Sequence, residues 1–278
     1  MTFAYVSKGD ARFAPGLQAL VRSLRSFDME SPIIIYDCGL SAEQNRKLRA
    51  SGCRIVRMPF HHTSRPETVE GTHYNDAIYA LMHIVELDVD AFVHLDADTV
   101  VFPSLGEMAA LLEAAEFVGV PDHPALTIGE NIGDAEQQAL AGALFPLKRD
   151  LKSVAINAGV FGAQMGAFRK LVSVMQRSYE SGLDLPRRDQ TLLNIALAVV
   201  DPTSMTLGVR FNFRHFFRRD PSLALDETRI VNGYRQPYYC QKPIAVMHYI
   251  GPDKPWMESF DRQSEAFQVW EQFSEKEE

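Results

Sequence analysis

The sequence predicts an α/β protein with a Rossmann-like mixed sheet flanked by helices, and three observations support this fold class. Short apolar runs typical of strands alternate with helical patterns through the first half of the 278 residues. The hydrophobic share of 46% is enough for a substantial core. Polar residues follow several of the apolar runs, at the positions where an open α/β sheet binds its ligands.

The first half contains three predicted strands and two predicted helices. In order they are a strand over residues 3–7, a helix over 15–27, a strand over 32–37, a helix from Ser41 and a strand over 54–58. Pro15 suits a first helical turn, and Leu17, Leu20 and Leu24 recur on one face of the helix that it starts. Strands that alternate with helices in this way form a parallel sheet with crossover connections.

The remaining elements follow from the same patterns. They are a loop over 59–75, a helix over 76–87, a strand over 91–95, a helix over 105–115, a strand over 117–120, a strand over 160–163, helices over 167–179 and 189–199, and a late strand over 244–247. Residues 121–152 are long enough to form a lid or to hold a short helix. No repeat, linker or change of composition divides the chain, so a single domain over residues 1–278 is predicted.

Charge and cysteine content limit the function classes. A net charge of −8 argues against a surface that binds nucleic acid or anionic lipid over its whole area, although a local basic patch would escape this argument. Cys38, Cys53 and Cys240 are far apart, which we interpret as buried thiols in a reducing compartment. No signal-peptide pattern and no apolar run of membrane-spanning length occurs, so a cytoplasmic protein is expected.

The motif Asp96-Ala97-Asp98 follows the apolar strand at residues 91–95. Two carboxylates one residue apart on a bending chain can converge on one hard divalent cation, whose other positions stay open to phosphate oxygens. The plainer interpretation is a pair of solvated turn carboxylates. Apolar runs on both sides weaken it, because like charges at a buried strand end are costly without a cation between them.

The same motif also resembles the first motif of haloacid-dehalogenase-type phosphatases, in which the first Asp attacks phosphorus. In this alternative Asp96 would be the nucleophile and a later acidic pair would complete a magnesium site. The sequence after Asp98 offers only isolated candidates such as Asp122 and Asp134. The motif also lies deep in the chain, whereas in that superfamily it usually comes first.

A second group of polar residues follows the late strand. His248 would be a suitable third ligand for manganese, Gly251 would let the backbone approach a phosphate, and Lys254 would add a positive charge. Taken singly, His248 has the alternative of a hydrogen-bonded core histidine, and Lys254 that of a solvated loop lysine. Their presence in one chain with Asp96 and Asp98 favours a functional interpretation.

From residue 3 to residue 256 the chain resembles family 8 glycosyltransferases of the GT-A fold, the group that contains glycogenin and bacterial lipopolysaccharide hexosyltransferases. The motifs that carry the resemblance, in the family's order, are FAPGLQALVRSLR (13–25), LDADTVV (95–101), INAGVF (156–161), DQTLLN (189–194) and HYIGPDKPW (248–256). The last is the most specific, because five of its residues match at fixed spacing.

The resemblance implies a retaining hexosyltransferase that moves a glucose- or galactose-type sugar from a nucleoside diphosphate donor, usually a UDP-sugar. It implies Mn²⁺, with Mg²⁺ as the alternative, on Asp96, Asp98 and His248, and it places Ala97 at the donor. It also implies a donor half over about residues 1–102 and an acceptor half over about 103–260. The acceptor would be a carbohydrate, a lipid-linked glycan or another hydroxyl compound, and a peripheral membrane contact is not indicated.

Two further motifs acquire roles from the resemblance. Asn157, Ala158 and Gly159 lead into the predicted strand at 160–163, and by resemblance they contact the donor sugar; a simple turn is the alternative. Asp189 and Gln190 start a helix, and by resemblance they are the catalytic pair, Asp189 stabilising oxocarbenium character and Gln190 positioning the sugar. Asp189 as a plain helix N-terminal charge is the alternative.

The chain departs from the family at two places. Ser7, Lys8 and Asp10 stand where the family usually has Thr and Asn near the donor base, and Phe13 retains an aromatic position. Residues 77–81 lack the usual basic residue, for which Lys8 is a candidate replacement. The stretch FNFRHFFRR (211–219) fits sugar stacking, an anionic acceptor or a membrane surface, and equally strand aromatics with exposed arginines. A noncatalytic sugar-nucleotide binder stays open as a further alternative.

Overall fold

The computed structural model describes residues 1–58, 78–122, 126–214 and 225–275. The chain divides into two units. The first comprises Met1–Val6, Met58–His94 and Met108–Leu207, and the second comprises Ser7–Arg57, Leu95–Glu107 and Gly208–Glu278. The predicted loop at 59–75 lies outside the described residues. The single domain over residues 1–278 stays a prediction.

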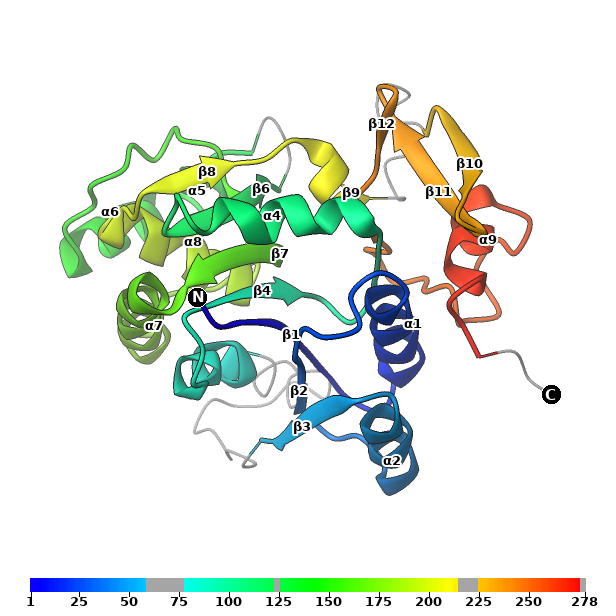
Figure 1. Ribbon diagram of the computed structural model, residues 1–278. Helices are drawn as coiled ribbons and strands as arrows, with labels where there is room; N and C mark the ends of the chain where they lie inside the picture. The colour runs from blue at the N-terminus through cyan, green and yellow to red at the C-terminus, as the bar shows by residue number, and fades with distance from the viewer. Residues whose placement is uncertain (59–77, 123–125, 215–224, 276–278) are drawn as a thin grey trace. The chain divides into compact units, whose positions relative to one another are not determined.

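The main sheet has seven strands in the order β3-β2-β1-β4-β7-β6-β8 (Figure 1). Its strands are β1 (Phe3–Gly9), β2 (Ile33–Asp37), β3 (Cys53–Arg57), β4 (Ala91–Leu95), β6 (Phe117–Pro121), β7 (Ile156–Gln164) and β8 (Ser204–Thr206). The pairs β1–β4, β2–β3 and β6–β8 are parallel, whereas β6–β7 is antiparallel. The mixed, mostly parallel sheet confirms the predicted α/β fold class.

Helices account for much of the rest of the first unit. They are residues 78–83, η1 (Ile84–Glu86), α4 (Gly106–Leu111), which begins in the second unit, α5 (Ile128–Ile132), α6 (Ala135–Leu144), α7 (Met165–Glu180) and α8 (Asp189–Val200). Aromatic rings fill the core of this unit: the Phe92 ring lies 4.8 Å from that of Phe168 and 5.9 Å from that of Phe161. These rings are fully buried, so they anchor β4, β7 and α7 to one another.

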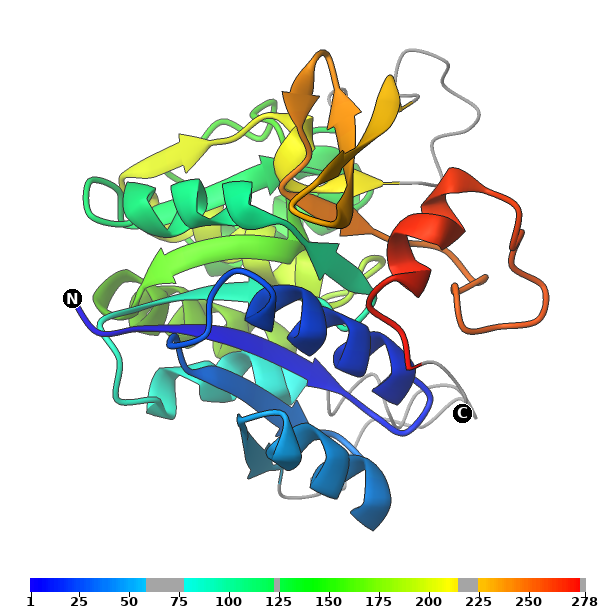
Figure 2. The ribbon, with the colours of Figure 1, turned by 45° about the vertical axis from the view of Figure 1, so that its right-hand side comes forward.

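Besides β2 and β3 of the main sheet, the described part of the second unit contains two small sheets, three α-helices and two short 3₁₀ helices (η). These elements are α1 (Ala14–Arg25), α2 (Ala42–Ala50), β5 (Thr99–Val101), η2 (Pro103–Leu105), η3 (Val209–Phe211), β9 (Phe213–Arg214), β10 (Glu227–Val231), β11 (Tyr234–Tyr239), β12 (Lys242–Pro243), β13 (Val246–His248) and α9 (Glu265–Glu271). One small sheet has the order β5-β13-β9, and the other has the order β10-β11-β12. Figure 2 shows α9 beside α1.

Local sequence explains the ends of several helices. Proline stands in the first turn of α1, as predicted, and Leu17, Leu20 and Leu24 are buried on one face of that helix. A capping box starts α2, because the Ser41 hydroxyl accepts from the Gln44 amide while the Gln44 side chain accepts from the Ser41 amide. These short-range signals are the ones that the sequence reveals most directly.

Three sequence-based interpretations were wrong in detail. β7 begins at Ile156, so Asn157, Ala158 and Gly159 lie inside the strand and do not precede it; pairing of β6 with Ile156 extends the ladder. His248 is the last residue of β13, and it belongs to the small sheet. Cys240 is exposed, because it occupies a turn with φ 47° between β11 and β12, while Cys38 and Cys53 are buried as expected.

A close backbone approach explains Gly16 in the first turns of α1. A Cβ atom at this position would lie 2.3 Å from the Ala97 carbonyl oxygen and 2.6 Å from Cη2 of Trp256. Such contacts do not occur in folded proteins, so only glycine lets the helix pack this closely against the acidic motif. Within the described residues, no helix combines the length and hydrophobicity needed to cross a membrane.

Replacing Gly16 with Ala should destabilise the protein by about 1–3 kcal/mol, because the new methyl group meets backbone that cannot rotate away. Gly166→Ala is the matched control: Gly166 is also in the first turns of a helix, but nothing lies within 4 Å of its added Cβ. We expect the control to be neutral or stabilising. Urea unfolding measures both, and equal midpoints for the two variants would contradict the close approach.

The three thiols should differ in reactivity. Burial raises the pKa of the Cys53 thiol to about 11, so at pH 8 roughly one molecule in a thousand carries the thiolate. An aromatic disulfide reagent should therefore modify exposed Cys240 first and Cys53 only after unfolding. Loss of the fast phase in Cys240→Ser checks the assignment. Equally fast modification of Cys53 would show that the thiol is not buried.

Candidate functional site

The acidic motif forms a tight turn between β4 and β5. The Thr99 amide donates to the Asp96 carbonyl at 3.2 Å, and the Thr99 hydroxyl donates to the same oxygen at 2.8 Å. The turn leaves the Asp96 side chain 33% exposed and the Asp98 side chain only 9% exposed. The two carboxylates are therefore held in one turn but in different environments.

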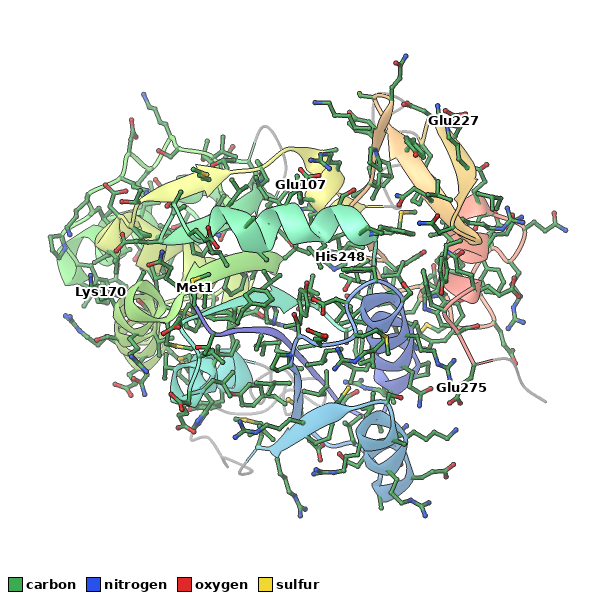
Figure 3. The ribbon with its side chains drawn as sticks, in the orientation of Figure 1. Met1, Glu107, Lys170, Glu227, His248 and Glu275 are labelled. Atoms are coloured by element: carbon green, nitrogen blue, oxygen red, sulfur yellow. The ribbon has the colours of Figure 1, made fainter. Side chains whose placement is uncertain are left out.

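His248 approaches this turn from the far end of the chain. In the small sheet its backbone is in register with Thr99 of β5. Its Nε2 lies 3.2 Å from Asp98 Oδ1 and 3.9 Å from Asp96 Oδ2. The His248 side chain, labelled in Figure 3, is buried. The structure thus brings together the three residues that the sequence proposed as metal ligands.

Asn212 holds the other side of the imidazole. Its Oδ1 lies 2.8 Å from His248 Nδ1, and both side chains are buried. A carbonyl oxygen can only accept, so Nδ1 carries the proton of this hydrogen bond and the Nε2 atom points at the carboxylates. A protonated imidazole would donate its Nε2–H to Asp98, whereas a neutral imidazole would direct the Nε2 lone pair at a cation held by the carboxylates.

The donor set fits a divalent metal ion. One ligand atom from each of Asp96, Asp98 and His248 lies within 4.8 Å of the others, and among the described residues no other such group of His, Cys, Asp and Glu occurs. Two carboxylates with one imidazole suit manganese, which accepts mixed oxygen and nitrogen ligands. Asn212 Oδ1, which accepts from His248 Nδ1, is the kind of orienting partner that metal-bound histidines generally have.

Lys254 pairs with the buried acid. Its Nζ lies 2.5 Å from Asp98 Oδ2 and donates to the Tyr249 carbonyl at 2.8 Å. The Tyr249 amide in turn donates to the Asp98 carbonyl at 2.8 Å. These three contacts tie the loop after β13 to the acidic turn, so Lys254 is a buried, fixed cation and not a solvated loop lysine.

The charge balance at Asp98 follows from these neighbours. Burial by itself would raise the pKa of this carboxyl, but the adjacent His248 and Lys254 more than offset burial and hold the pKa well below its ordinary value. Asp98 is therefore ionised throughout the neutral range. A negative charge is thus maintained beside the imidazole.

The end of β1 contributes buried polar groups to the second unit. Ser7 and Lys8 are 2% and 8% exposed, and the Ser7 hydroxyl has no hydrogen-bond partner among the described residues. A Cβ atom on Gly9 would lie 3.5 Å from the Cβ of Ala97. The strand end and the acidic turn are therefore neighbours, and the Ser7 hydroxyl is a buried polar group without a partner among the described residues.

Asp10 and Phe13 organise the start of α1. Asp10 Oδ1 accepts from the Arg12 and Phe13 amides, and its Oδ2 accepts from the Arg12 guanidinium. The Phe13 ring lies 5.9 Å from that of Trp256, edge to face, and 5.7 Å from the Lys254 ammonium. Asp10 thus has a clear structural role in the turn, and Phe13 lies beside the cation.

Gly251 precedes Lys254 in the same loop. Its φ of 99° falls in the region that side chains rarely adopt, so glycine is required there for conformation. Two residues after Lys254, Trp256 packs over Gly16 and Phe13. The loop is therefore fixed at both ends, by a glycine turn and by an indole.

A second polar cluster lies in the first unit. Asn157 Nδ2 donates to Gln190 Oε1 at 2.8 Å and to Asp122 Oδ1 at 3.1 Å, while Asn157 Oδ1 accepts from the Gly159 amide at 3.0 Å. Asn194 joins β7 to α8, because it accepts from the Ile156 amide and donates to the Ile156 carbonyl. Asn157 and Gln190, which the sequence analysis named in two separate motifs, are thus in direct contact.

Asp189 and Gln190 begin α8, as the sequence predicted. Asp189 Oδ1 accepts from the Gln190 amide at 3.0 Å, and Asp189 is partly exposed. The Gln190 side-chain nitrogen makes no hydrogen bond within the described chain, which leaves a donor for a ligand hydroxyl. Ala158 and Gly159 of β7 are buried.

Comparison with known protein families shows to which family the chain belongs. The sequence model of Glycosyl transferase family 8 matches residues 5–259. The chain belongs to this family. No curated protein sequence matched the chain.

Solved structures agree with the family 8 assignment at the level of the fold. The galactosyltransferase LgtC, solved with donor and acceptor sugar analogues, is similar with a TM-score of 0.67 and 20% identity over 97% of this chain and 94% of that chain. The bifunctional glycosyltransferase WbbM gives 0.65 and 17% over 98% of this chain and 49% of that chain. The glycosyltransferase GlyE of Streptococcus pneumoniae TIGR4 gives 0.59 and 18% over 99% of this chain and 60% of that chain. These likenesses confirm the GT-A fold.

The sequence analysis gave two residues of this family 8 chain no role at the transferase site, although it named Asp122 as an isolated acid in the phosphatase alternative. Asp122 directly follows β6, as Asp96 directly follows β4, and this common position was a usable signal. Asn212 gave no such signal, because its role depends on β9 lying beside β13. In the stretch at 211–219, Arg214 is buried, although β9 is an edge strand of its small sheet, so the alternative of exposed arginines does not hold for this residue. Residues 215–219 and Ala77 lie outside the described residues.

Removing the ammonium of Lys254 should strongly destabilise the metal-free protein. Lys254→Met leaves the buried Asp98 carboxylate without its cation, at a cost of about 3–5 kcal/mol, and adding Asp98→Asn should recover part of that loss. Because the folded pKa of Asp98 is lowered, the wild-type contribution is present above about pH 4 and declines below it. Urea unfolding at pH 7 and pH 3 measures both effects.

Lys47→Met is the control for the loss of a lysine. Its ion pair with Glu275 is exposed, so stability should hardly change. If Lys254→Met were as stable to urea as Lys47→Met, the buried ion pair would contribute nothing to the free energy of unfolding.

Proposed function

We propose that this protein is a retaining hexosyltransferase that moves a glucose- or galactose-type sugar from a UDP-sugar to a hydroxyl acceptor with the help of Mn²⁺. The observation that carries the proposal is the convergence of Asp96, Asp98 and His248 within 4.8 Å, in a chain that belongs to family 8. A divalent ion on these residues would act as a Lewis acid toward the leaving diphosphate. Mg²⁺ is the alternative ion.

The side chains around the acidic turn would bind the diphosphate. Lys254 is held by Asp98 and by the Tyr249 carbonyl, so its charge is already positioned when a phosphate arrives. We propose that Lys254 and the backbone at Gly251 stabilise the negative charge that develops on the departing diphosphate. The Ser7 hydroxyl, with Lys8, Phe13 and Ala97, would contact the nucleotide.

The cluster in the first unit would bind the transferred sugar. Asn157 and Gln190 offer amide groups to its hydroxyls, and Ala158 and Gly159 leave room for its ring. Asp189 would stabilise positive charge at the anomeric carbon. An LgtC structure described as an active-site mutant with glutamine changed to glutamate supports a functional glutamine in such enzymes. Asp122, which Asn157 contacts, would orient this amide.

The same phosphate oxygen that leaves the sugar can accept the proton of the acceptor hydroxyl. A front-face transfer of this kind retains the anomeric configuration and needs no separate general base. The acceptor would be a carbohydrate, a lipid-linked glycan or another alcohol. Free thiols at Cys38, Cys53 and Cys240 are in keeping with a reducing, cytoplasmic location.

The proposal is tested by ligand-dependent stability and by product analysis. UDP should raise the melting temperature only when Mn²⁺ is present, by an amount that corresponds to about 2.7 kcal/mol at a hundred times the dissociation constant. Asp96→Asn should abolish this gain. Asp88→Asn is the matched control, because Asp88 is an exposed carboxylate near the opposite end of the same strand. Stabilisation of Asp96→Asn equal to wild type would refute the site.

Product analysis separates the three functions. Incubation with a panel of UDP- and GDP-sugars, followed by NMR of the nucleotide and the sugar, should show Mn²⁺-dependent release of UDP and an unchanged anomeric configuration. Phosphate release from small esters would instead support the phosphatase. Binding of UDP with no turnover on any sugar would support a noncatalytic binder.

A further inference from the structure

A groove of about 820 Å³ lies in the second unit, apart from the residues proposed for catalysis. Its walls are α1 and α9, which lie side by side in both views (Figures 1 and 2), and residues of the loop at 255–262 complete it. The Glu275 carboxylate closes one end, because it forms ion pairs with Arg22 and Lys47 at 3.0 and 2.9 Å. Figure 3 shows Glu275 beside α1.

Aromatic rings form the apolar part of the groove. The rings of Trp256 and Trp270 lie 6.1 Å apart, and the Phe267 ring lies 6.0 Å from Trp270. Trp256 is partly exposed, whereas Trp270 is 7% exposed and its indole nitrogen has no hydrogen-bond partner among the described residues. The groove therefore combines an accessible indole with a buried donor that the protein leaves unused.

Planar polar groups surround these rings. The side-chain amides of Gln18 and Gln268 make no hydrogen bonds within the described part of the chain, although both line the groove. Glu271 is exposed beside them, and Arg262 stacks over the Phe267 ring at 5.8 Å. The charged residues of the lining are two arginines, Arg235 and Arg262, and two glutamates, Glu271 and Glu275, so the formal charge of the lining is zero, which suits a neutral ligand.

These features match the chemistry of a neutral sugar. The C–H face of a pyranose ring packs on an indole, while its hydroxyls act as donors and acceptors at once and so satisfy amides and carboxylates together. A proline-rich peptide would also pack on tryptophan, but it lacks backbone N–H groups and would leave the acceptors of Gln18, Gln268 and Glu271 unused. The observations therefore favour a glycan over such a peptide.

We propose that this groove is a second carbohydrate-binding site, which binds a neutral oligosaccharide between α1 and α9. The site would recognise the oligosaccharide through the faces of its sugar rings and through its hydroxyl groups, and binding would require neither a metal ion nor a nucleotide. The site does not depend on the proposed transfer reaction, although it would suit a glycan that is also an acceptor.

Tryptophan fluorescence offers a direct test, because the chain has only two tryptophans and both line the groove. Malto-, cello- and β-galacto-oligosaccharides of four to six units are titrated into the wild-type chain in the presence of EDTA, with saturation-transfer NMR as a second readout. At least one series should shift the emission saturably. No shift and no saturation transfer with all three series would overturn the proposal, as would a shift produced by decaproline alone.

Variants locate the binding. The double variant Gln268→Ala with Glu271→Ala, on the groove side of α9, should weaken binding about tenfold or more, while Glu265→Ala, an exposed acid of the same helix outside the groove, should not. Unchanged binding by the double variant would place the sugar elsewhere and overturn the proposal. Asp96→Asn should keep oligosaccharide binding, so failure of the metal site and failure of the groove are distinguishable.

Discussion

The ion pair between Lys254 and Asp98 is the constraint on which the second unit depends. The two residues are 156 positions apart in sequence, yet they are buried together with 2.5 Å between Nζ and Oδ2. A buried carboxylate is costly without a neighbouring cation. If the loop after β13 moved away, it would take Lys254 with it and leave the buried Asp98 carboxylate unpaired. The Tyr249 backbone links the same two residues, because its carbonyl accepts from Lys254 Nζ and its amide donates to the Asp98 carbonyl. The position of the His248 side chain is thus fixed by the Lys254–Asp98 ion pair as well as by the pairing of β13 with β5.

Packing and charge cooperate at this place. Gly16 lets α1 approach the Ala97 carbonyl, and Trp256 covers the space that a side chain at Gly16 would fill. The same indole touches Phe13 on one side and lines the α1–α9 groove on the other. The motif HYIGPDKPW therefore serves several purposes within nine residues: an imidazole, a glycine turn, a buried ammonium and an aromatic cover. This explains why its spacing is so restrictive.

Sequence patterns predicted much of the fold, because strands, helix caps and apolar faces are local signals. The predicted strands and helices occur in the predicted order, and Asp96, Asp98 and His248 are grouped as predicted, but the strands β8 to β12 were not predicted. Features that depend on tertiary pairing could not be predicted from the sequence. The placement of β13 in a separate sheet, the hydrogen bond from His248 to Asn212 and the start of β7 at Ile156 all require a partner strand. The turn that exposes Cys240 depends on backbone conformation that composition does not encode.

The discontinuity of the second unit has a consequence for biosynthesis. Residues Leu95–Glu107 leave the ribosome long before Gly208–Glu278, which complete the same unit. A nascent chain that stops before β13 has the two aspartates but neither the imidazole nor the ammonium that neutralises them, and β5 is an unpaired strand. Closing a loop of this length is slow compared with local helix formation. The candidate metal-binding group is therefore incomplete until β13 and the loop that follows it have been synthesised.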